Sequence, residues 1–452
     1  MAALEALPLT SSMGGTMSRR LRILILGLNY APEPTGIAPY TTGMARFLAD
    51  AGHDVHVITG LPHYPTWKVA DGYRGRRIQE WDGNVRVTRV WHPVPRKPTG
   101  RARITLEAVF ALQASAVAGA RPDVVLAVSP ALLTVATTLR WKSPGRTAIG
   151  VIAQDLYSRA IVETGALGGR GAKAARRLES ALLRRADGVI AIHDTFRRSL
   201  VGLGVEDRRI TTIRNWTHVA QDVGNVVDLR TRLGWRDNET VVLHAGNMGA
   251  KQGLENVVDA ARLADRRGST LRFVLLGHGN QRTALEMRAR GVHHVQILDP
   301  LPNGEFETAL AASDILLLNE RPGVEEMCVP SKLTSYFSSG RPVVAATSRR
   351  SAAASEVTNS GGGVLVEPGR PEDLLEMCEV LAKDPANRVS MGMQGQVFAR
   401  GMLSGGAARS AYLRWVEGLA TPAAALPIPA TRDDWRSTDF SGRRVGLVEG
   451  VS

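Results

Sequence analysis

Residues 327–344 read MCVPSKLTSYFSSGRPVV, and they contain in turn a loop, a helix start, a helix end and a strand. Pro330 and Ser331 are typical of a helix start, and Gly340 is typical of a helix end. The apolar run 342–346 predicts the strand that follows. A helix start exposes unpaired N–H groups that attract anions, and Lys332 adds a positive charge there. Ser331 and Lys332 therefore predict a phosphate or pyrophosphate site; the alternative is an ordinary surface helix.

The same alternation of short apolar runs and helix-like segments extends in both directions from this stretch. Expected strands lie at 21–28, 54–59, 124–129, 148–153, 188–193 and 210–215, and then at 240–245, 271–276, 294–298, 315–319, 342–346 and 363–366. Expected helices include 40–51, 254–267, 281–290, 305–312 and 371–383. Strands that alternate with helices indicate βαβ units and parallel sheets. We therefore expect the α/β class, with two Rossmann-like doubly wound domains in tandem that face a cleft.

Breaks in the pattern set the expected domain boundaries. Residues 1–20 lack the apolar core of a secretion signal, so we expect a flexible leader. The first domain is expected at 21–216, a polar linker at 217–238 and the second domain at 239–385. Helices at 386–420 are expected to cross back to the first domain, and 421–452, rich in Ala, Pro and Arg, is expected to be a disordered tail.

Composition excludes several classes of protein. The chain has 452 residues, 44% of them hydrophobic, which is enough for globular cores. The two cysteines, Cys328 and Cys378, give no disulfide framework, and this favours a reducing, cytoplasmic compartment. The ten histidines are scattered and no CxxC or HExxH motif occurs, so we expect no metal site.

The net charge of +13 predicts an anionic partner. The chain shows no nucleic-acid motif and only 5% aromatic residues, so a membrane surface fits better than a nucleic acid. Basic residues precede the apolar segment 104–120, which is too short and too polar to span a membrane. That segment either docks in the membrane interface or is a core helix with a basic collar, and the basic helix at 173–185 has the same two interpretations. The collar consists of Arg96, Lys97, Arg101 and Arg103.

Two loops of the second domain follow predicted strands and carry groups suited to a ligand. Loop 246–253, GNMGAKQG, combines three glycines with Lys251 and precedes a helix, so it predicts an anion-binding nest. A pyrophosphate needs two or more such donor groups, and Ser331 with Lys332 supplies the second set. Loop 319–327, NERPGVEEM, holds three glutamates that either accept hydrogen bonds from sugar hydroxyls or are simply solvated.

Three segments of the first domain also lie at the ends of predicted strands. Loop 29–43, NYAPEPTGIAPYTTG, contains Gly36, which permits a turn or a close ligand approach, but it is not a GxGxxG fingerprint. Asp155 ends a strand and is either a catalytic or acceptor-binding group or a helix cap. His63, Tyr64 and Trp67, in HYPTWK, either line an acceptor site or pack internally.

Five segments together resemble bacterial exopolysaccharide glycosyltransferases of the colanic-acid type, within the retaining, nucleotide-sugar-dependent GT-B family four. The order and spacing of the segments match, and the resemblance covers roughly residues 21–419. The segments are TGIAPYTTGMARFLADAGHDVHVIT (35–59), PHYPTWKV (62–69), RNWTHV (214–219), HAGNMGAKQGLENV (244–257) and VPSKLTSYFSSGRPVV (329–344).

The resemblance implies a GT-B fold whose second domain binds the nucleotide-sugar donor. Lys251 and Lys332 would contact the donor diphosphate, and Gly36 would approach it from the first domain. No cofactor or metal is implied beyond the donor itself. The first domain would bind a saccharide or lipid-linked acceptor at the cytoplasmic face of the membrane. The remaining donor-site residues would be Gly246, Asn247, Ser331 and Ser335.

The chain also departs from the wider family. That family carries two glutamates eight positions apart, where this chain has Met327 and Ser335, and Glu326 is the nearest substitute for the first. Many relatives have Arg at the position of Asn247, whereas the colanic-acid type shares the Asn. Close relatives have acidic residues where Ser158 and Arg159 stand, which leaves the acceptor and the donor sugar open.

Three functions therefore remain. The first is a glycosyltransferase that moves a sugar with retention by front-face attack, with Asp155 and Glu326 as its catalytic candidates. The second is a nucleotide-sugar epimerase of related architecture, and the third is a catalytically silent scaffold that binds a nucleotide sugar. The donor sugar, the base and the acceptor are not specified by the sequence.

Overall fold

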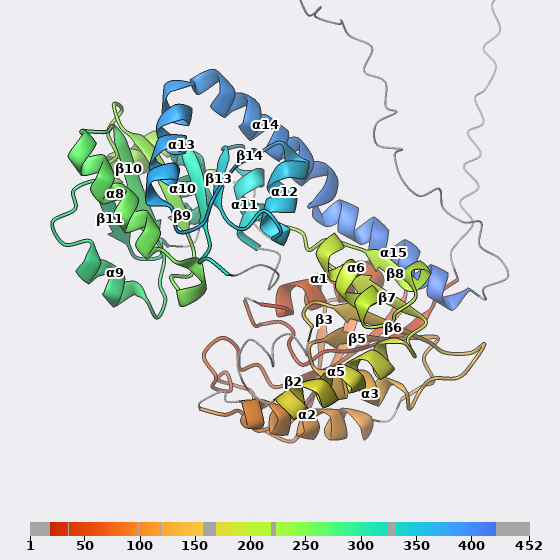
Figure 1. Ribbon diagram of the computed structural model, residues 1–452. Helices are drawn as coiled ribbons and strands as arrows, with labels where there is room; N and C mark the ends of the chain where they lie inside the picture. Colours follow the sequence, from red (N-terminus) through yellow and green to blue (C-terminus); the bar gives the residue numbers. More distant parts are fainter. Residues whose placement is uncertain are drawn as a thin grey trace, which may run out of the picture. The chain divides into compact units, whose positions relative to one another are not determined.

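The computed structural model describes residues 19–34, 36–96, 100–117, 119–156, 169–217, 223–302, 304–323 and 331–421. The described part contains two sheets, each with helices on its faces (Figure 1). All strand pairs except one are parallel. The predicted α/β class with two doubly wound halves is confirmed.

The first sheet has eight strands in the order β3-β4-β2-β1-β5-β6-β7-β8. Strand β1 shows why the sheet is covered on both sides: Ile23 and Ile25 pack in one core cluster, and Leu24 and Leu26 pack in another. The strands are β1 (Arg22–Leu26), β2 (Asp54–Gly60), β3 (Arg77–Asp82), β4 (Val85–Val90), β5 (Val124–Ser129), β6 (Ala148–Ala153), β7 (Gly188–Ala191) and β8 (Ile210–Thr212). The helices are α1 (Ala38–Asp50), α2 (Gly100–Ser115), α3 (Leu132–Thr138), α5 (Gly169–Leu183) and α6 (Asp194–Gly202), with the 3-10 turn η1 (Asp207–Arg209).

The hairpin of β3 and β4 at the edge of this sheet was not predicted from the sequence. Strand β3 pairs antiparallel with β4, and no other strand of the described residues pairs with it. Its residues are at most half-buried, because an edge strand needs few apolar positions. The helix α3, only seven residues long, was missed as well.

The second sheet has six strands in the order β11-β10-β9-β12-β13-β14. Val242 on β9 packs in one core cluster, and its neighbours Val241 and Leu243 pack in another, so this sheet is also buried on both faces. The strands are β9 (Thr240–Ala245), β10 (Leu271–Leu276), β11 (Val295–Leu298), β12 (Ile315–Asn319), β13 (Val343–Ala346) and β14 (Gly363–Val366). The helices are α7 (Val226–Leu233), α8 (Glu255–Arg267), α9 (Arg282–Arg288), α10 (Glu305–Ala312), α11 (Ser331–Ser338), α12 (Ala352–Ser360) and α13 (Pro371–Lys383), with the 3-10 turn η2 (Ala250–Gln252).

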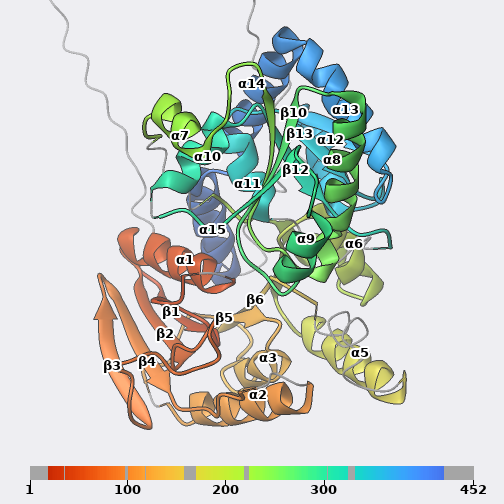
Figure 2. The same cartoon turned by 90° about the vertical axis from the view of Figure 1, so that its left-hand side faces the viewer.

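Two C-terminal helices contact different sheets. Helix α14 (Pro385–Met402) packs on α11, whereas α15 (Gly405–Ala420) packs on α1 and β6 (Figure 2). A Cβ atom on Gly150 would lie only 2.6 Å from the Trp415 ring, so the small residue of β6 makes room for α15. Tyr412 of α15 also packs edge-on against Trp216, with ring centroids 6.0 Å apart.

Part of the segment predicted as a linker is helical. The segment predicted as a linker, 217–238, contains helix α7, whose N-cap Asn225 accepts from the backbone N–H groups of Val227 and Asp228. The predicted leader and tail lie almost entirely outside the described residues. Within the described ranges, no helix has the length and apolar character needed to cross a bilayer.

Candidate functional site

Two glycine-rich loops meet at the carboxyl ends of β9 and β10. The Met248 N–H donates to the His278 carbonyl at 2.9 Å, and the Gln281 N–H donates to the Met248 carbonyl at 3.0 Å. A Cβ atom on Gly277 would lie 2.0 Å from the Gly246 oxygen, so only glycine permits this approach. The second loop, GHGN at 277–280, was overlooked in the sequence, although two glycines directly after a strand indicate such a close contact.

Loop 246–253 is also fastened to the end of β12. The Asn319 side-chain amide donates to the carbonyls of Gln252 at 2.7 Å and Gly253 at 2.9 Å. The Arg321 N–H donates to the Lys251 carbonyl at 2.8 Å. The side chains of Asn247 and Lys251 are exposed. A fixed backbone therefore presents both side chains to solvent at the ligand-binding edge of the sheet.

Helix α11 brings Lys332 to the same loop. The Lys332 Cε atom lies 2.9 Å from the position that a Cβ on Gly246 would occupy, and Gly246 has φ of +124°. Lys332 Nζ lies 2.8 Å from Nε2 of the buried His244, at the end of β9. Gly246, Lys251 and Lys332 were predicted to share a site, and they belong to adjoining parts of this edge. Ser335, one turn after Lys332, is half-buried.

Burial sets the charges of this edge. The protein surrounding the ammonium lowers the pKa of Lys332 to about 7, although the charge of Glu320 opposes this effect. Burial raises the pKa of Glu320, while a hydrogen bond from the Thr347 hydroxyl acts the other way. Burial, together with the Lys332 charge, holds the pKa of His244 well below its usual range. His244 begins the segment 244–257 that carries the family resemblance, but it received no role of its own, because its partner Lys332 lies 88 positions away in the sequence.

Several predicted site residues cannot be placed. Glu326 and the positions at Ser158 and Arg159 lie outside the described residues. Ser331 is the first residue of α11, as predicted, but its side chain is not described. The predicted end of this helix is confirmed, since α11 ends at Ser338 and Gly340 has φ of +71°.

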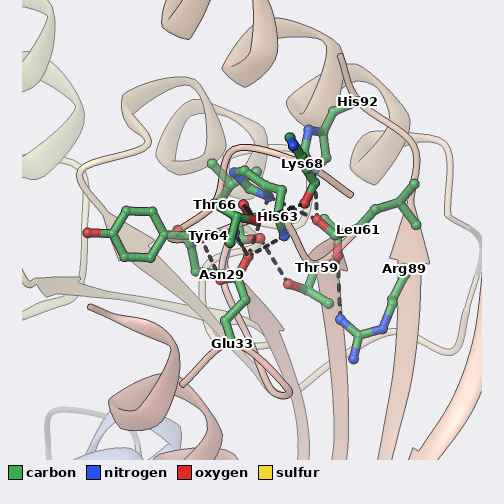
Figure 3. Close-up of polar contacts among 12 residues, drawn as sticks. Asn29, Glu33, Thr59, Leu61, His63, Tyr64, Thr66, Lys68, Arg89 and His92 are labelled. Atoms are coloured by element: carbon green, nitrogen blue, oxygen red, sulfur yellow. Dashed lines mark hydrogen bonds and ion pairs between the residues drawn. The ribbon is translucent and has the colours of Figure 1, made fainter. Parts of the chain in front are cut away.

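In the first sheet, the buried carboxylate of Glu33 organises the segment 63–68 (Figure 3). Its Oε1 accepts from the backbone N–H groups of His63 at 2.8 Å and Tyr64 at 2.9 Å. Its Oε2 accepts from the Asn29 side-chain amide at 2.8 Å. Glu33 therefore ties the loop after β1 to the loop after β2. The sequence analysis quoted Glu33 without assigning it a role, because a single glutamate among prolines carries no signal.

The three predicted acceptor residues have different environments. His63 is buried, and its Nδ1 donates to the Leu61 carbonyl at 2.9 Å, so it packs internally. The ring of Tyr64 projects away from the cluster in Figure 3, and its Cε1 lies 3.1 Å from a Cβ position on Gly36. Trp67 has a positive φ of 53°, and the Arg103 guanidinium lies 5.4 Å from the centroid of its ring. Tyr64 and Trp67 are partly exposed, and Gly36 adjoins Tyr64.

Two carboxylates lie near the end of β5. Asp155 follows β6; its carbonyl accepts from the Ser129 hydroxyl at 3.0 Å, and its Oδ1 accepts from the Leu156 N–H at 2.8 Å. Glu107 of α2 bonds to the backbone of Leu132, and burial raises the pKa of Glu107 to about 8. Glu107 Oε2 is buried without a hydrogen-bond partner among the described residues. The sequence analysis noted Glu107 only as a polar interruption of an apolar segment.

Two family models match the chain in tandem. Residues 35–216 match the glycosyl transferase 4-like domain, and residues 239–384 match the glycosyl transferases group 1. The first match covers the eight-stranded sheet from α1 onward, and the second covers the six-stranded sheet up to the end of α13.

Individual relatives agree with the family models. WcaI of Escherichia coli (strain K12), named as a colanic acid biosynthesis glycosyl transferase, is 32% identical over 373 residues, which is 78% of this chain and 90% of WcaI. The solved structure of HepE from Anabaena in complex with UDP has a TM-score of 0.64 at 16% identity and covers 88% of this chain and 100% of HepE. WaaG, a glycosyltransferase involved in lipopolysaccharide biosynthesis, has a TM-score of 0.60 at 15% identity and covers 86% of this chain and 98% of WaaG. The chain therefore belongs to the GT-B glycosyltransferases of the colanic-acid-biosynthesis type.

Proposed function

We propose that this glycosyltransferase moves a sugar from a nucleotide-diphosphate donor to a hydroxyl of a lipid-linked or saccharide acceptor, with retention at the anomeric carbon. The observation that carries the proposal is the fixed loop 246–253 beside the Lys332 ammonium. Two lysines and the start of helix α11 place positive charge at this edge that matches a diphosphate. HepE, a structural neighbour, was solved with UDP and with UDP-glucose, which supports a donor of this class.

The leaving group is a nucleoside diphosphate, so the main electrostatic task is to stabilise the charge that develops on it. Lys251, exposed on its fixed loop, and Lys332, enclosed beside Gly246, are proposed to contact the diphosphate. Asn247, Ser331 and Ser335 are proposed to complete the donor site. We propose no cofactor or metal beyond the donor, because two lysines and a helix start already supply positive charge.

The acceptor is proposed to bind the first domain. Glu33 fixes the backbone of segment 63–68, and the fixed segment leaves Tyr64 and Trp67 partly exposed. Gly36, in contact with Tyr64, is proposed to approach the donor diphosphate. Asp155 and Glu326 are proposed to lie at the reacting centre. The leaving phosphate is proposed to take the acceptor proton in a front-face attack.

A basic surface supports peripheral membrane association at the cytoplasmic face. Helix α5 lines a cavity of ≈ 300 Å³ with three cations and the Ser180 hydroxyl. On the same helix, Leu178 is 45% exposed, so apolar and basic groups lie close together. Such a surface suits anionic lipid headgroups. The three cations are Lys173, Arg176 and Arg177.

The test is a melting-temperature screen against UDP, GDP, ADP and dTDP, followed by the matching nucleotide sugars. Binding to the folded state raises the melting temperature by mass action. We expect a shift with one nucleotide that is reduced in Lys251→Met. Release of that nucleotide from its sugar only when an acceptor glycolipid is added would support a transferase, and NMR of the product would give the anomeric configuration.

The alternatives give different results in the same assay. An epimerase would change the sugar of the donor without an acceptor, and a silent scaffold would bind the donor without releasing nucleotide. Absence of a shift with all four nucleotides and all their sugars would refute the proposed donor site.

A further inference from the structure

His244 is a buried histidine that contacts both the sheet and the proposed donor site. It occupies the penultimate position of β9, two residues before Gly246. Its Nδ1 lies 3.2 Å from the Leu317 carbonyl of the neighbouring strand β12. Its Nε2 lies 2.8 Å from Lys332 Nζ. The imidazole therefore joins β12 to the side chain of α11 that adjoins the glycine loop.

The contact with Leu317 defines the tautomer of His244. A carbonyl oxygen only accepts hydrogen bonds, so the ring proton lies on Nδ1. The Nε2 atom then carries a lone pair, and Lys332 must donate to it. Burial and the Lys332 charge both disfavour a second proton on the ring, and they outweigh the hydrogen bonds with the backbones of Leu317 and Asn247, so the imidazole is neutral.

A neutral acceptor differs in one important respect from a carboxylate. A carboxylate would hold the ammonium but would also cancel its charge, whereas the imidazole holds it and leaves the charge available. The Lys332 Nζ atom lies 3.5 Å from the Cβ position of Gly246, so this charge is kept at the backbone of loop 246–253.

We infer that His244 is a positioning residue that, through the Nε2 lone pair, holds the Lys332 ammonium in place for the donor diphosphate. The inference rests on the proposed function. It makes His244 a determinant of donor affinity although the side chain is too deeply buried to touch the donor.

The Lys332 ammonium makes donor binding depend on pH. Burial lowers the pKa of free Lys332 to about 7, and an added diphosphate would favour the charged form, so binding takes up a proton above this pH. Among the described residues, the titratable groups that act on Lys332 are His244 from β9 and Glu320 from the segment after β12. Donor affinity should thus fall as the pH rises above about 7. Without the Nε2 acceptor, the ammonium loses a partner and the fall should begin at a lower pH.

Three substitutions separate the two hydrogen bonds of His244. His244→Gln places an amide oxygen near the position of Nε2 and preserves an acceptor for Lys332. His244→Asn preserves a donor near Nδ1 but lacks the acceptor, and His244→Phe lacks both. Dissociation constants for UDP, GDP, ADP and dTDP would be measured by calorimetry from pH 6 to pH 9, after melting curves show that each variant is folded.

We expect the Asn and Phe variants to bind the preferred nucleotide about tenfold more weakly at neutral pH, the loss typical of one hydrogen bond to a charged group. In both, the fall in affinity should begin at a lower pH, while His244→Gln should resemble the wild type. If Phe does not fold, the comparison of Gln with Asn decides.

The other outcomes overturn the inference. Identical pH profiles in all variants would show that His244 serves only the fold, and so would an equal loss of affinity in Gln and Asn. Either result would leave the proposed function intact, provided that the wild type binds. Failure of the wild type to bind any of the four nucleotides would overturn the inference and the proposed donor site together.

Discussion

Replacement of Lys332 by Met should stabilise the free protein and at the same time remove donor binding. The pKa of Lys332 falls from 10.5 to about 7 in the folded state, so the fold disfavours its charged form. Each pKa unit is worth about 1.4 kcal/mol, so this fall corresponds to about 4 kcal/mol at neutral pH. The residue as a whole keeps some exposure, which reduces the penalty to about 2 kcal/mol.

Lys332→Met also has a cost, because His244 Nε2 loses its donor. A buried acceptor without a partner costs about 1 kcal/mol, which leaves a net gain of about 1 kcal/mol. For domains of this size, that gain raises the melting temperature by about 2–4 °C. The expected variant is thus more stable than the wild type and shows no shift with the preferred nucleotide.

Lys332 should also make the stability of the wild type depend on pH. The unfolded chain keeps the Lys332 proton up to pH 10.5, whereas the folded chain releases it near pH 7, so the stability of the wild type should rise between these values. This rise should be absent in Lys332→Met, so the variant should melt higher at neutral pH and the wild type should melt higher near pH 10. The assay is a series of melting curves from pH 6 to pH 10 with and without nucleotide.

Lys251→Met is the matched control, because Lys251 lies on the same edge but is exposed. It should change the free energy of unfolding of the free protein by no more than about 0.5 kcal/mol and should weaken nucleotide binding. A lower melting temperature for Lys332→Met at neutral pH, or an undiminished nucleotide shift, would refute the role given to Lys332.

Three further predictions concern stability. Glu356→Gln should lower the free energy of unfolding by about 3 kcal/mol, because the buried carboxylate binds Arg214 at 2.9 Å and His193 at 2.9 Å. Burial raises the pKa of Glu356, but its two partners lower it by more, so the pKa lies below its ordinary value. The carboxylate should therefore stabilise the fold above pH 4.5 and lose this contribution in stronger acid, which urea titrations at several pH values would measure. Glu107→Gln should increase the free energy of unfolding at pH 8 by about 2 kcal/mol, because burial raises the pKa of the Glu107 carboxyl. The wild type should lose stability as the pH rises from 4.5 to about 8, and the variant should not. Equal pH profiles of the two proteins would contradict this. Gly277→Ala should lower the free energy of unfolding by more than about 2 kcal/mol and reduce the rise in melting temperature with nucleotide, because its Cβ would meet the Gly246 oxygen at a φ of +141°. An unchanged melting curve would show that the two loops can separate.

The sequence predicted the buried part of the fold well, because parallel strands covered on both faces are short, continuous apolar runs. Six expected strands, such as 124–129, 148–153 and 240–245, have the observed bounds. The hairpin β3–β4 was missed because an edge strand has little to bury.

The candidate site was predictable only where its residues occur in motifs. Glycine next to lysine after a strand indicated loop 246–253, and a helix start with a lysine indicated α11. Glu33 and His244 had no such signal, because their roles depend on contacts with residues 30 and 88 positions away. Contacts of that range are created by the sheet topology and do not appear in any local pattern.

His244, Lys332 and Glu320 together suggest why this edge keeps ionisable groups where apolar ones would be more stable. Glu320 is anchored through Thr347, whose hydroxyl also lies 2.9 Å from that of Ser351, at the start of α12. Glu320 therefore acts on Lys332 from a fixed position, and His244 fixes the direction of the ammonium from the neighbouring strand β9. A lysine held by a neutral partner keeps its charge for a ligand but weakens the free protein, which is the balance between stability and function expected of a binding site. A substitution at any of these three positions that stabilises the free protein and leaves donor binding unchanged would contradict this interpretation.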